Sequence, residues 1–159
     1  YDRVLDALLR ELQAVYGDRL VSVAVYGSVG RGTPRPGLDI DVLIVARDLP
    51  PDSFVRFQEQ EPVRQRLETA LRELNPGGHS VLLSPVLKTP EAVEHGSPLF
   101  LDMVDDARIL FDRDGFFAGY LEGLRGRLRA LGSRRVWVGD TWYWDLKPDL
   151  KPGEVFDWP

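Results

Sequence analysis

The sequence predicts an α/β (α+β) fold in which helices pack against a mixed β-sheet of about four or five strands. Amphipathic helical segments alternate along the chain with short runs of β-branched residues, and clusters of glycine and proline separate them. The order of the expected elements is helix, strand, strand, helix, strand, helix, strand and helix. A length of 159 residues with 43% hydrophobic content suits one domain of ordinary size.

The first part of the chain supplies a helix, two strands and the loop between them. Apolar residues at helical spacing predict a helix over residues 2–16, and Gly17 is expected to end it. Residues 20–26 are rich in β-branched side chains and predict a strand. Residues 27–37 contain four glycines and two prolines, so we expect a loop with one helical turn. Residues 38–45 form the second expected strand.

A long helix is expected after the proline pair at 50–51. Asp52 or Ser53 can cap this helix, which is expected to run to about Leu74. Pro62 lies inside the segment, so we expect a kink or two helices.

The next part of the chain alternates short elements. Residues 75–78 predict a turn, and residues 79–87 predict a third strand that Pro85 disturbs. Two short helices are expected at 90–94 and 98–106, because each has a proline near its first turn. Residues 107–111 predict a fourth strand.

The C-terminal part begins with a helix that Asp114 is expected to cap and that runs over about residues 115–131. The stretch from Ser133 contains all four tryptophans together with prolines, so it cannot be one regular element. We therefore divide the chain into a core over residues 1–112 and a C-terminal helix with a Trp-rich tail over 113–159, packed on that core as a single globular unit.

The composition excludes several kinds of chemistry. The chain has no cysteine and only two histidines, so disulfides, zinc–thiolate sites and cysteine nucleophiles are excluded, and a multi-histidine metal site is not expected. A net charge of −5 argues against a broad basic surface for long nucleic acid. No apolar run approaches the ~20 residues that a membrane span needs, and no signal peptide is visible. We expect a cytoplasmic protein whose chemistry uses carboxylates, hydroxyls, backbone amides and bound ions.

One region combines a glycine-rich turn with two acidic residues. Gly27, Ser28 and Arg31 follow the first strand, and Asp39 and Asp41 lie two positions apart on the second. Residues two apart in a strand share a face, so the two carboxylates are expected side by side. Such a pair repels itself unless a cation lies between the carboxylates, and apolar neighbours make the repulsion costlier. A hard divalent ion such as Mg²⁺, which prefers oxygen ligands, would relieve it.

The glycine-rich turn suits a phosphate. Glycines let backbone N–H groups approach an anion, and a following helical turn directs its positive end at it. Ser28 adds a hydroxyl donor and Arg31 a fixed charge. A phosphate loop beside paired carboxylates predicts Mg²⁺-assisted phosphoryl or nucleotidyl transfer.

These residues carry a family resemblance. Gly27-Ser28, Arg31-Gly32 and Asp39-x-Asp41, in this register, resemble the signature of the polymerase β-like nucleotidyltransferase superfamily in its compact, minimal-nucleotidyltransferase form. The resemblance implies that Gly27 and Ser28 bind a nucleoside triphosphate, and that Asp39 and Asp41 are catalytic residues that also hold Mg²⁺. It implies a nucleotide-binding role for Arg31, which could instead brace the loop. The spacing matches neither a Walker P-loop nor the dinucleotide fingerprint.

Two departures from the family pattern concern the same site. Active members usually carry a third carboxylate on the strand after the next helix, where it helps to hold the metal and to activate the attacking hydroxyl. In this chain that strand, residues 80–87, contains no Asp or Glu. Glu91, Glu94 and Asp102 are the nearest candidates in the helices that follow. The residue before the Asp pair is Leu38, where the family often has serine.

Several features also have a simpler structural interpretation. A pair of aspartates or a run of glycines is usually structural when it stands alone, and here the coupling of the two favours a nucleotide site. The arginines of the last helix are expected to form a solvated face, with a groove for an anionic substrate as the alternative. Residues 142–144 are expected to cover core surface, with a stacking wall for a base or a partner-binding patch as alternatives. His79 and His95 are expected to be a strand-start residue and a loop residue.

The leading hypothesis is an enzyme that transfers a nucleoside monophosphate from a nucleoside triphosphate to an acceptor hydroxyl with Mg²⁺ and releases pyrophosphate. A small molecule, a protein side chain and an RNA end are open as acceptors, and the acidic charge counts against a polynucleotide. The alternative is a catalytically degenerate nucleotide-binding or partner-binding domain. Such a domain would be similar to the antitoxin half of two-component toxin–antitoxin pairs, with a helical protein partner. A third hypothesis is an interaction module that uses the Trp-rich tail.

Overall fold

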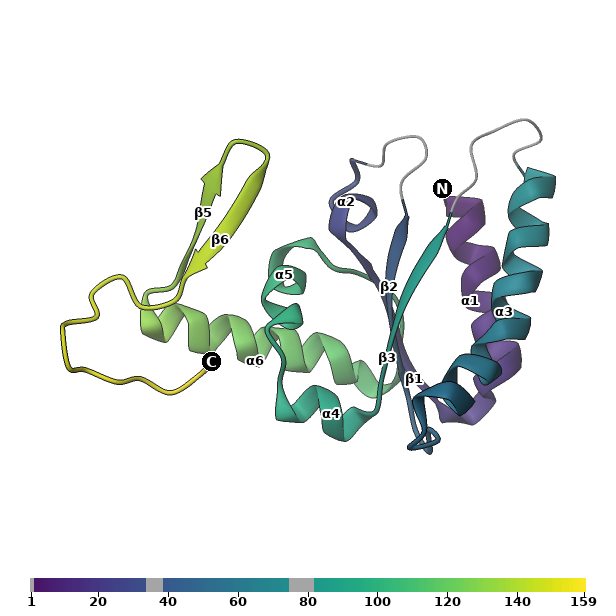
Figure 1. Ribbon diagram of the computed structural model, residues 1–159, viewed down its shortest axis with the longest axis horizontal. Helices are drawn as coiled ribbons and strands as arrows, with labels where there is room; N and C mark the ends of the chain where they lie inside the picture. Colours follow the sequence, from purple (N-terminus) through teal and green to yellow (C-terminus); the bar gives the residue numbers. More distant parts are fainter. Residues whose placement is uncertain (1, 34–38, 75–81) are drawn as a thin grey trace.

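The body of the molecule is a mixed β-sheet with helices on both faces, as Figure 1 shows. This computed structural model describes residues 2–33, 39–74 and 82–159, and the expected turn at 75–78, Leu38 and His79 lie outside the described residues. The strands of the sheet are β1 (Leu20–Tyr26), β2 (Ile40–Ala46), β3 (Leu83–Lys88) and β4 (Arg108–Asp112). The helices are α1 (Asp2–Tyr16), α2 (Gly27–Gly30), α3 (Ser53–Leu74), α4 (Pro90–His95), α5 (Leu99–Asp106) and α6 (Phe116–Leu131), with 3-10 turns η1 (Gly17–Arg19) and η2 (Arg113–Gly115).

The strands lie in the order β3-β2-β1-β4, and their directions make the sheet mixed, as the sequence predicts. β1 runs antiparallel to both of its neighbours, and β2 runs parallel to β3. The register places Tyr26 opposite Asp41, and Asp41 opposite Ser84. The end of β1, the start of β2 and the start of β3 therefore meet at one edge of the sheet.

Two apolar layers separate the sheet from its helices. On one face, Ile40, Val42 and Ile44 of β2 are buried with residues of α1 and α3. On the other face, Leu43 and Val45 are buried with residues of α4, α5 and α6. Because successive side chains of a strand alternate between faces, Asp41 shares the face of Leu43, on which α5 lies.

The tail after α6 forms a separate two-stranded sheet. β5 (Arg134–Val138) and β6 (Thr141–Asp145) pair as an antiparallel hairpin, and the chain from 146 to 159 has no regular element. Figure 1 shows the hairpin on the side of the sheet that carries α5 and α6. The expectation that this stretch is not one regular element is confirmed.

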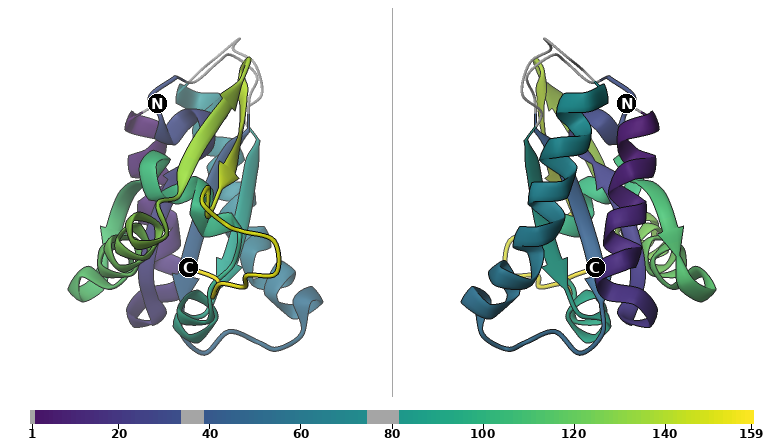
Figure 2. Two further views of the ribbon diagram at one scale, coloured as in Figure 1. Left: turned by 90° about the vertical axis from the view of Figure 1, so that its left-hand side faces the viewer. Right: turned by 90° about the vertical axis from the view of Figure 1, so that its right-hand side faces the viewer.

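The element boundaries agree closely with the sequence prediction. The expected helix over 2–16 and the strand over 20–26 have the predicted bounds, and the single helical turn expected after them is α2. β4 begins one residue after its predicted start, and the predicted starts of β2 and β3, at 38 and 79, lie outside the described residues. Pro62 lies inside one continuous helix, α3, and Figure 2 shows the first part of that helix turned away from the direction of the rest. Within the described residues, no helix has the length and apolar character that crossing a bilayer requires.

The predicted cap of the last helix is wrong. Asp114 lies in η2 at a positive φ of 53° and makes no capping hydrogen bond. Asp112 at the end of β4 caps the helix instead. Its two carboxylate oxygens accept hydrogen bonds from the backbone N–H groups of Phe117 and Ala118, at 2.9 Å each. The hydroxyl of Ser22 on β1 also donates to Asp112 at 2.6 Å, so this carboxylate ties α6 to the sheet.

Candidate active site

The turn after β1 is folded as a short helical turn with glycines at its constrained positions. Gly27 has a φ of +64°, a conformation that glycine adopts without strain. The backbone N–H of Arg31 donates to the carbonyl of Gly27 at 3.1 Å, and that of Thr33 donates to the carbonyl of Ser28 at 2.9 Å. A Cβ atom added at Gly30 would overlap the carbonyl oxygen of Asp106, so only glycine lets α2 pack this closely on the end of α5.

The turn lies directly against the first acidic residue of β2. A Cβ added at Gly27 would lie 2.6 Å from Oδ2 of Asp41, which means that the Gly27 backbone and the Asp41 carboxylate are neighbours. Burial is the largest cause that raises the pKa of Asp41, and the charge of Asp39 raises that pKa further. A hydrogen bond from Ser84 and the charge of Arg31 oppose this rise.

The two aspartates are close, but they do not both lie in the strand. Asp41 is the second residue of β2 and half-buried, whereas Asp39 is exposed and precedes the strand. The charge of Asp39 nevertheless raises the pKa of Asp41, so the two carboxylates lie within electrostatic reach of each other. The structure places Gly27 against Asp41, but Asp39 precedes the strand in which the sequence predicts both aspartates.

The position beside Asp41 on β3 is occupied by Ser84. This strand is the one on which the family pattern expects a third carboxylate, and its described residues 83–88 contain none. Glu91 and Glu94 lie on α4, which follows the far end of β3, so they are at the opposite end of the sheet from Asp41 (Figure 1). In the part of the chain that the structure describes, no group of three or more acidic or histidine side chains could hold a metal ion.

Asp102 lies nearer to the site than the other two candidates. Burial raises the pKa of Tyr26, and the charges of Asp41 and Asp102 raise it further. The Tyr26 hydroxyl therefore lies within electrostatic reach of both carboxylates. The indole N–H of Trp142 donates to Oδ1 of Asp102 at 3.1 Å, which links this side of the site to the hairpin.

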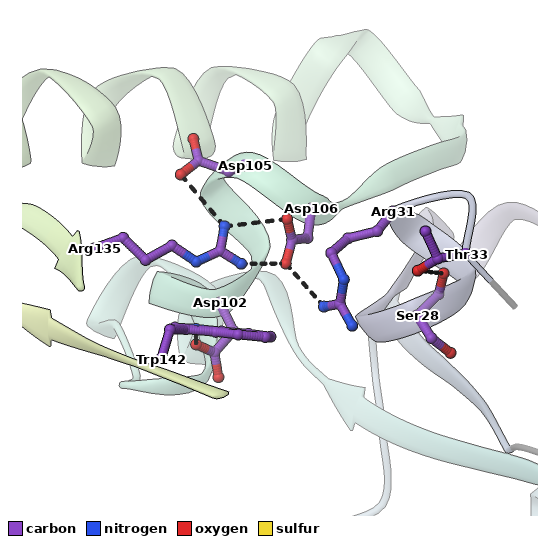
Figure 3. A network of polar contacts seen from close by, with 8 residues as sticks. All are labelled: Ser28, Arg31, Thr33, Asp102, Asp105, Asp106, Arg135 and Trp142. Atoms are coloured by element: carbon purple, nitrogen blue, oxygen red, sulfur yellow. Dashed lines mark hydrogen bonds and ion pairs between the residues drawn. The ribbon is translucent and has the colours of Figure 1, made fainter. Parts of the chain in front are cut away.

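Arg31 is directed away from the serine of its own turn. Figure 3 shows its guanidinium reaching towards Asp106, while the side chain of Ser28 points away from this network. Nη1 of Arg31 donates to Oδ2 of Asp106 at 3.1 Å, and the carboxylate is only 7% exposed. In this structure Arg31 braces the turn against α5.

The remaining candidates lie outside this group. His95 ends α4, on the helix that also carries Glu91 and Glu94. On α6, Arg125 pairs with Glu122 at 2.6 Å and donates to the carbonyl of Val104 at 2.5 Å, so this arginine helps to hold α6 to α5.

Sequence reasoning missed four residues in this region: Ser84, Tyr26, Asp106 and Arg135. Ser84 could be found only from the register of β3 on β2, which the local sequence does not specify. Tyr26 directly precedes Gly27 at the end of the predicted strand. This position next to the glycine-rich turn could have indicated that Tyr26 lies at the site. Asp106 and Arg135 are joined across 29 positions and carry no local signal.

Comparison with known proteins finds sequences similar to this chain. A family model described as a nucleotidyltransferase domain matches residues 5–84 of the chain. A protein of Methanocaldococcus jannaschii that carries the provisional name protein adenylyltransferase is 25% identical over 147 residues, which cover 91% of this chain and 93% of that protein.

Two solved structures are also similar in part. One chain of a toxin–antitoxin structure with AMP-PNP is 21% identical with a TM-score of 0.48, and the match covers 79% of this chain and 90% of that one. One chain of a structure of the tri-AMPylated Shewanella oneidensis HEPN toxin with its MNT antitoxin is 19% identical with a TM-score of 0.45, covering 81% and 89%.

Proposed function

The chain belongs to the nucleotidyltransferase domain family, and on this premise we propose that it transfers a nucleoside monophosphate from a nucleoside triphosphate to an acceptor hydroxyl. The observation that carries the proposal is the contact between the Gly27 backbone and the Asp41 carboxylate. A triphosphate bound at the turn would have its reacting phosphorus next to the acidic pair.

The reaction balances without any further reactant. The acceptor oxygen forms a bond with the α-phosphorus, the bond from that phosphorus to the α,β-bridging oxygen breaks, and pyrophosphate leaves. The hydroxyl proton passes to water or to a carboxylate of the site. The protein's contribution is to position the two reactants and to offset the charge that develops on the phosphate oxygens.

Asp39 and Asp41 fit a divalent cation. Their carboxylate oxygens are the ligands that Mg²⁺ prefers, and the charge of Asp39 on Asp41 is a repulsion that a cation relieves. These two residues would hold Mg²⁺, which would supply positive charge to the phosphate oxygens. Gly27 and Ser28 bind the β,γ-phosphates with a backbone N–H and a hydroxyl, and Arg31 supports nucleotide binding from the same turn.

We further propose that the nucleotide is ATP and the acceptor a hydroxyl of a protein side chain. The name of the Methanocaldococcus jannaschii relative supports this choice over a small molecule or an RNA end. In this proposal residues 1–112 form the nucleotidyltransferase core, and residues 113–159 pack on it and face the acceptor. Nucleoside triphosphates are abundant in the cytoplasm, where we place the protein.

A second candidate function is a nucleotide-binding or partner-binding domain without turnover. The occurrence of Ser84 beside Asp41, where a third carboxylate is expected, favours it. In that case a helical protein partner, rather than an acceptor, would occupy the exposed side of the site.

The test is incubation with α-labelled ATP and Mg²⁺ in the presence of a protein pool, small alcohols or RNA as separate acceptors. We expect label on protein, and loss of labelling in Asp39→Asn and Asp41→Asn. Asp18→Asn is the matched control, because this exposed aspartate lies in η1 at the opposite end of β1. If ATP binds but no acceptor is labelled, and Asp39→Asn changes binding alone, the second candidate function replaces the first.

A further inference from the structure

The β5–β6 hairpin meets the rest of the protein through one of its two faces. The register pairs Arg135 with Trp144 and Trp137 with Trp142, so these four side chains share a face. Trp144 packs against the apolar layer that contains α5 and α6. The neighbouring Tyr143 belongs to the other face and is 56% exposed.

Arg135 anchors this face to the end of α5. Its guanidinium makes a forked contact with Asp106, with Nη1 to Oδ1 at 3.2 Å and Nη2 to Oδ2 at 2.5 Å (Figure 3). Both side chains are largely buried, at 13% and 7% exposed. A forked arginine–carboxylate contact fixes the geometry of both groups as well as their distance.

The same carboxylate holds Arg31 of the nucleotide-binding turn. Oδ2 of Asp106 thus accepts from one arginine of the hairpin and one arginine of the turn. Trp142 lies next to both guanidinium groups, with its ring centre 4.9 Å from Cζ of Arg31 and 4.2 Å from Cζ of Arg135. Its indole N–H is held by Asp102, so the ring is fixed on two sides.

We propose that the β5–β6 hairpin positions the nucleotide-binding turn by holding Arg31 between Trp142 and Asp106. This inference rests on the proposed function for its nucleotide, but its structural part does not. Arg31 directly follows α2, and its backbone N–H closes the turn onto Gly27. Fixing the Arg31 side chain therefore fixes the backbone that is to receive the phosphates, and Arg31, Trp142 and Arg135 are positioning residues rather than phosphate ligands.

The structural part is tested by hydrogen exchange without nucleotide. The backbone N–H groups of Arg31, Gly32 and Thr33 are the reporters, because each donates within the turn. In Trp142→Ala we expect these amides to exchange about tenfold faster, while amides of α1 keep their rates. Tyr143→Ala is the matched control on the opposite face of the same strand and should leave the turn unchanged.

A conservative variant separates positioning from general destabilisation. Trp142→Phe keeps an aromatic ring beside Arg31 while it removes the hydrogen bond to Asp102 and part of the ring surface, so the turn amides should exchange within about threefold of the wild-type rates. The proposal is overturned if Trp142→Ala accelerates exchange no more than Tyr143→Ala, if α1 accelerates equally, or if Trp142→Phe behaves like Trp142→Ala.

The functional part is tested by titrating a non-hydrolysable ATP analogue with Mg²⁺ into the full chain. We expect Trp142→Ala and Arg31→Ala each to weaken binding about tenfold, and the double variant to bind no worse than either single one, because the two act on one contact. Additive losses would overturn the coupling. A wild-type chain that binds no nucleotide would overturn the proposed function, while the exchange experiment would still decide whether the hairpin positions the turn.

Discussion

Gly27 lies against the side chain of Asp41, so closely that a Cβ atom on the glycine would come within 2.6 Å of Oδ2. This contact joins the end of β1 to the start of β2 at the edge of the sheet where the candidate site lies. Glycine therefore meets two requirements at this position: it adopts the positive φ without strain, and it leaves room for the Asp41 carboxylate.

Gly27→Ala is expected to lower both stability and nucleotide transfer. The new methyl group would force Asp41 to move, and the φ of +64° is unfavourable for alanine. We expect a loss of about 1–3 kcal/mol in the free energy of unfolding, measured by urea denaturation. Nucleotide transfer should fall about tenfold or more, because the carboxylate is displaced.

Gly119→Ala is the control for this substitution. Gly119 lies in α6, and a Cβ added there would meet no atom within 4 Å. This variant should gain about 0.5–1 kcal/mol, since alanine is the better helix former. A Gly27→Ala protein with the stability and activity of the wild type would contradict the close contact.

The pH dependence of stability should carry the signature of Asp41. Burial and the charge of Asp39 raise the pKa of Asp41 above its ordinary value of 3.8, so folding favours the protonated form. The contribution of this group to stability is therefore fully present below the ordinary pKa and is lost as the pH rises through the raised one. Asp41→Asn removes this loss. The stability of this variant relative to the wild type should therefore increase as the pH rises from 3.8 through the raised pKa, and then level off.

The measurement is urea denaturation at a series of pH values, with and without Mg²⁺. Mg²⁺ favours the ionised carboxylate, so it should stabilise the wild type above the window and have little effect on Asp41→Asn. A difference between the two proteins that stays constant with pH would mean that the pKa of Asp41 is not raised by folding.

Much of this site could be predicted from the sequence because its signals are local. α1 and β1 have the predicted bounds, since Leu5, Leu8 and Leu12 repeat at helical spacing and the strand is rich in valine. That Gly27 forms a turn and that Asp41 lies near it could be predicted because each lies at the end of a predicted strand. Prediction of the family needed only this part of the chain.

The rest depends on contacts between distant segments. Ser84 reaches Asp41 through strand register, and Arg31 meets Arg135 only because both pair with Asp106. The hairpin did have a local signal, because Gly139 and Asp140 separate two short runs of β-branched and aromatic residues. The prolines further along the tail made the whole stretch from Ser133 look irregular, so the hairpin was not predicted.

Ser84→Asp should restore a third carboxylate beside Asp41. Without metal the new charge would repel Asp41 and Asp39, so we expect a lower melting temperature than that of the wild type. With Mg²⁺ the three carboxylates can share one cation, so the rise in melting temperature on adding Mg²⁺ should be larger than in the wild type.

Ser84→Asn is the isosteric control for this gain. It changes the size of the side chain without adding charge, so its melting temperature should respond to Mg²⁺ no more than that of the wild type. Equal responses of Ser84→Asp and Ser84→Asn would show that the β3 position does not face the metal site.

Asp112→Ala should destabilise the protein far more than Asp114→Ala, in contrast to the capping role that the sequence predicts for Asp114. Loss of the Asp112 carboxylate leaves the N–H groups of Phe117 and Ala118 and the buried hydroxyl of Ser22 without their acceptor. We expect a loss of about 2 kcal/mol in the free energy of unfolding. Asp114 is exposed with a φ of +53°, so Asp114→Gly should be neutral or gain up to about 1 kcal/mol. Chemical denaturation of the three variants decides the matter, and a larger loss in Asp114→Ala than in Asp112→Ala would return the cap to Asp114.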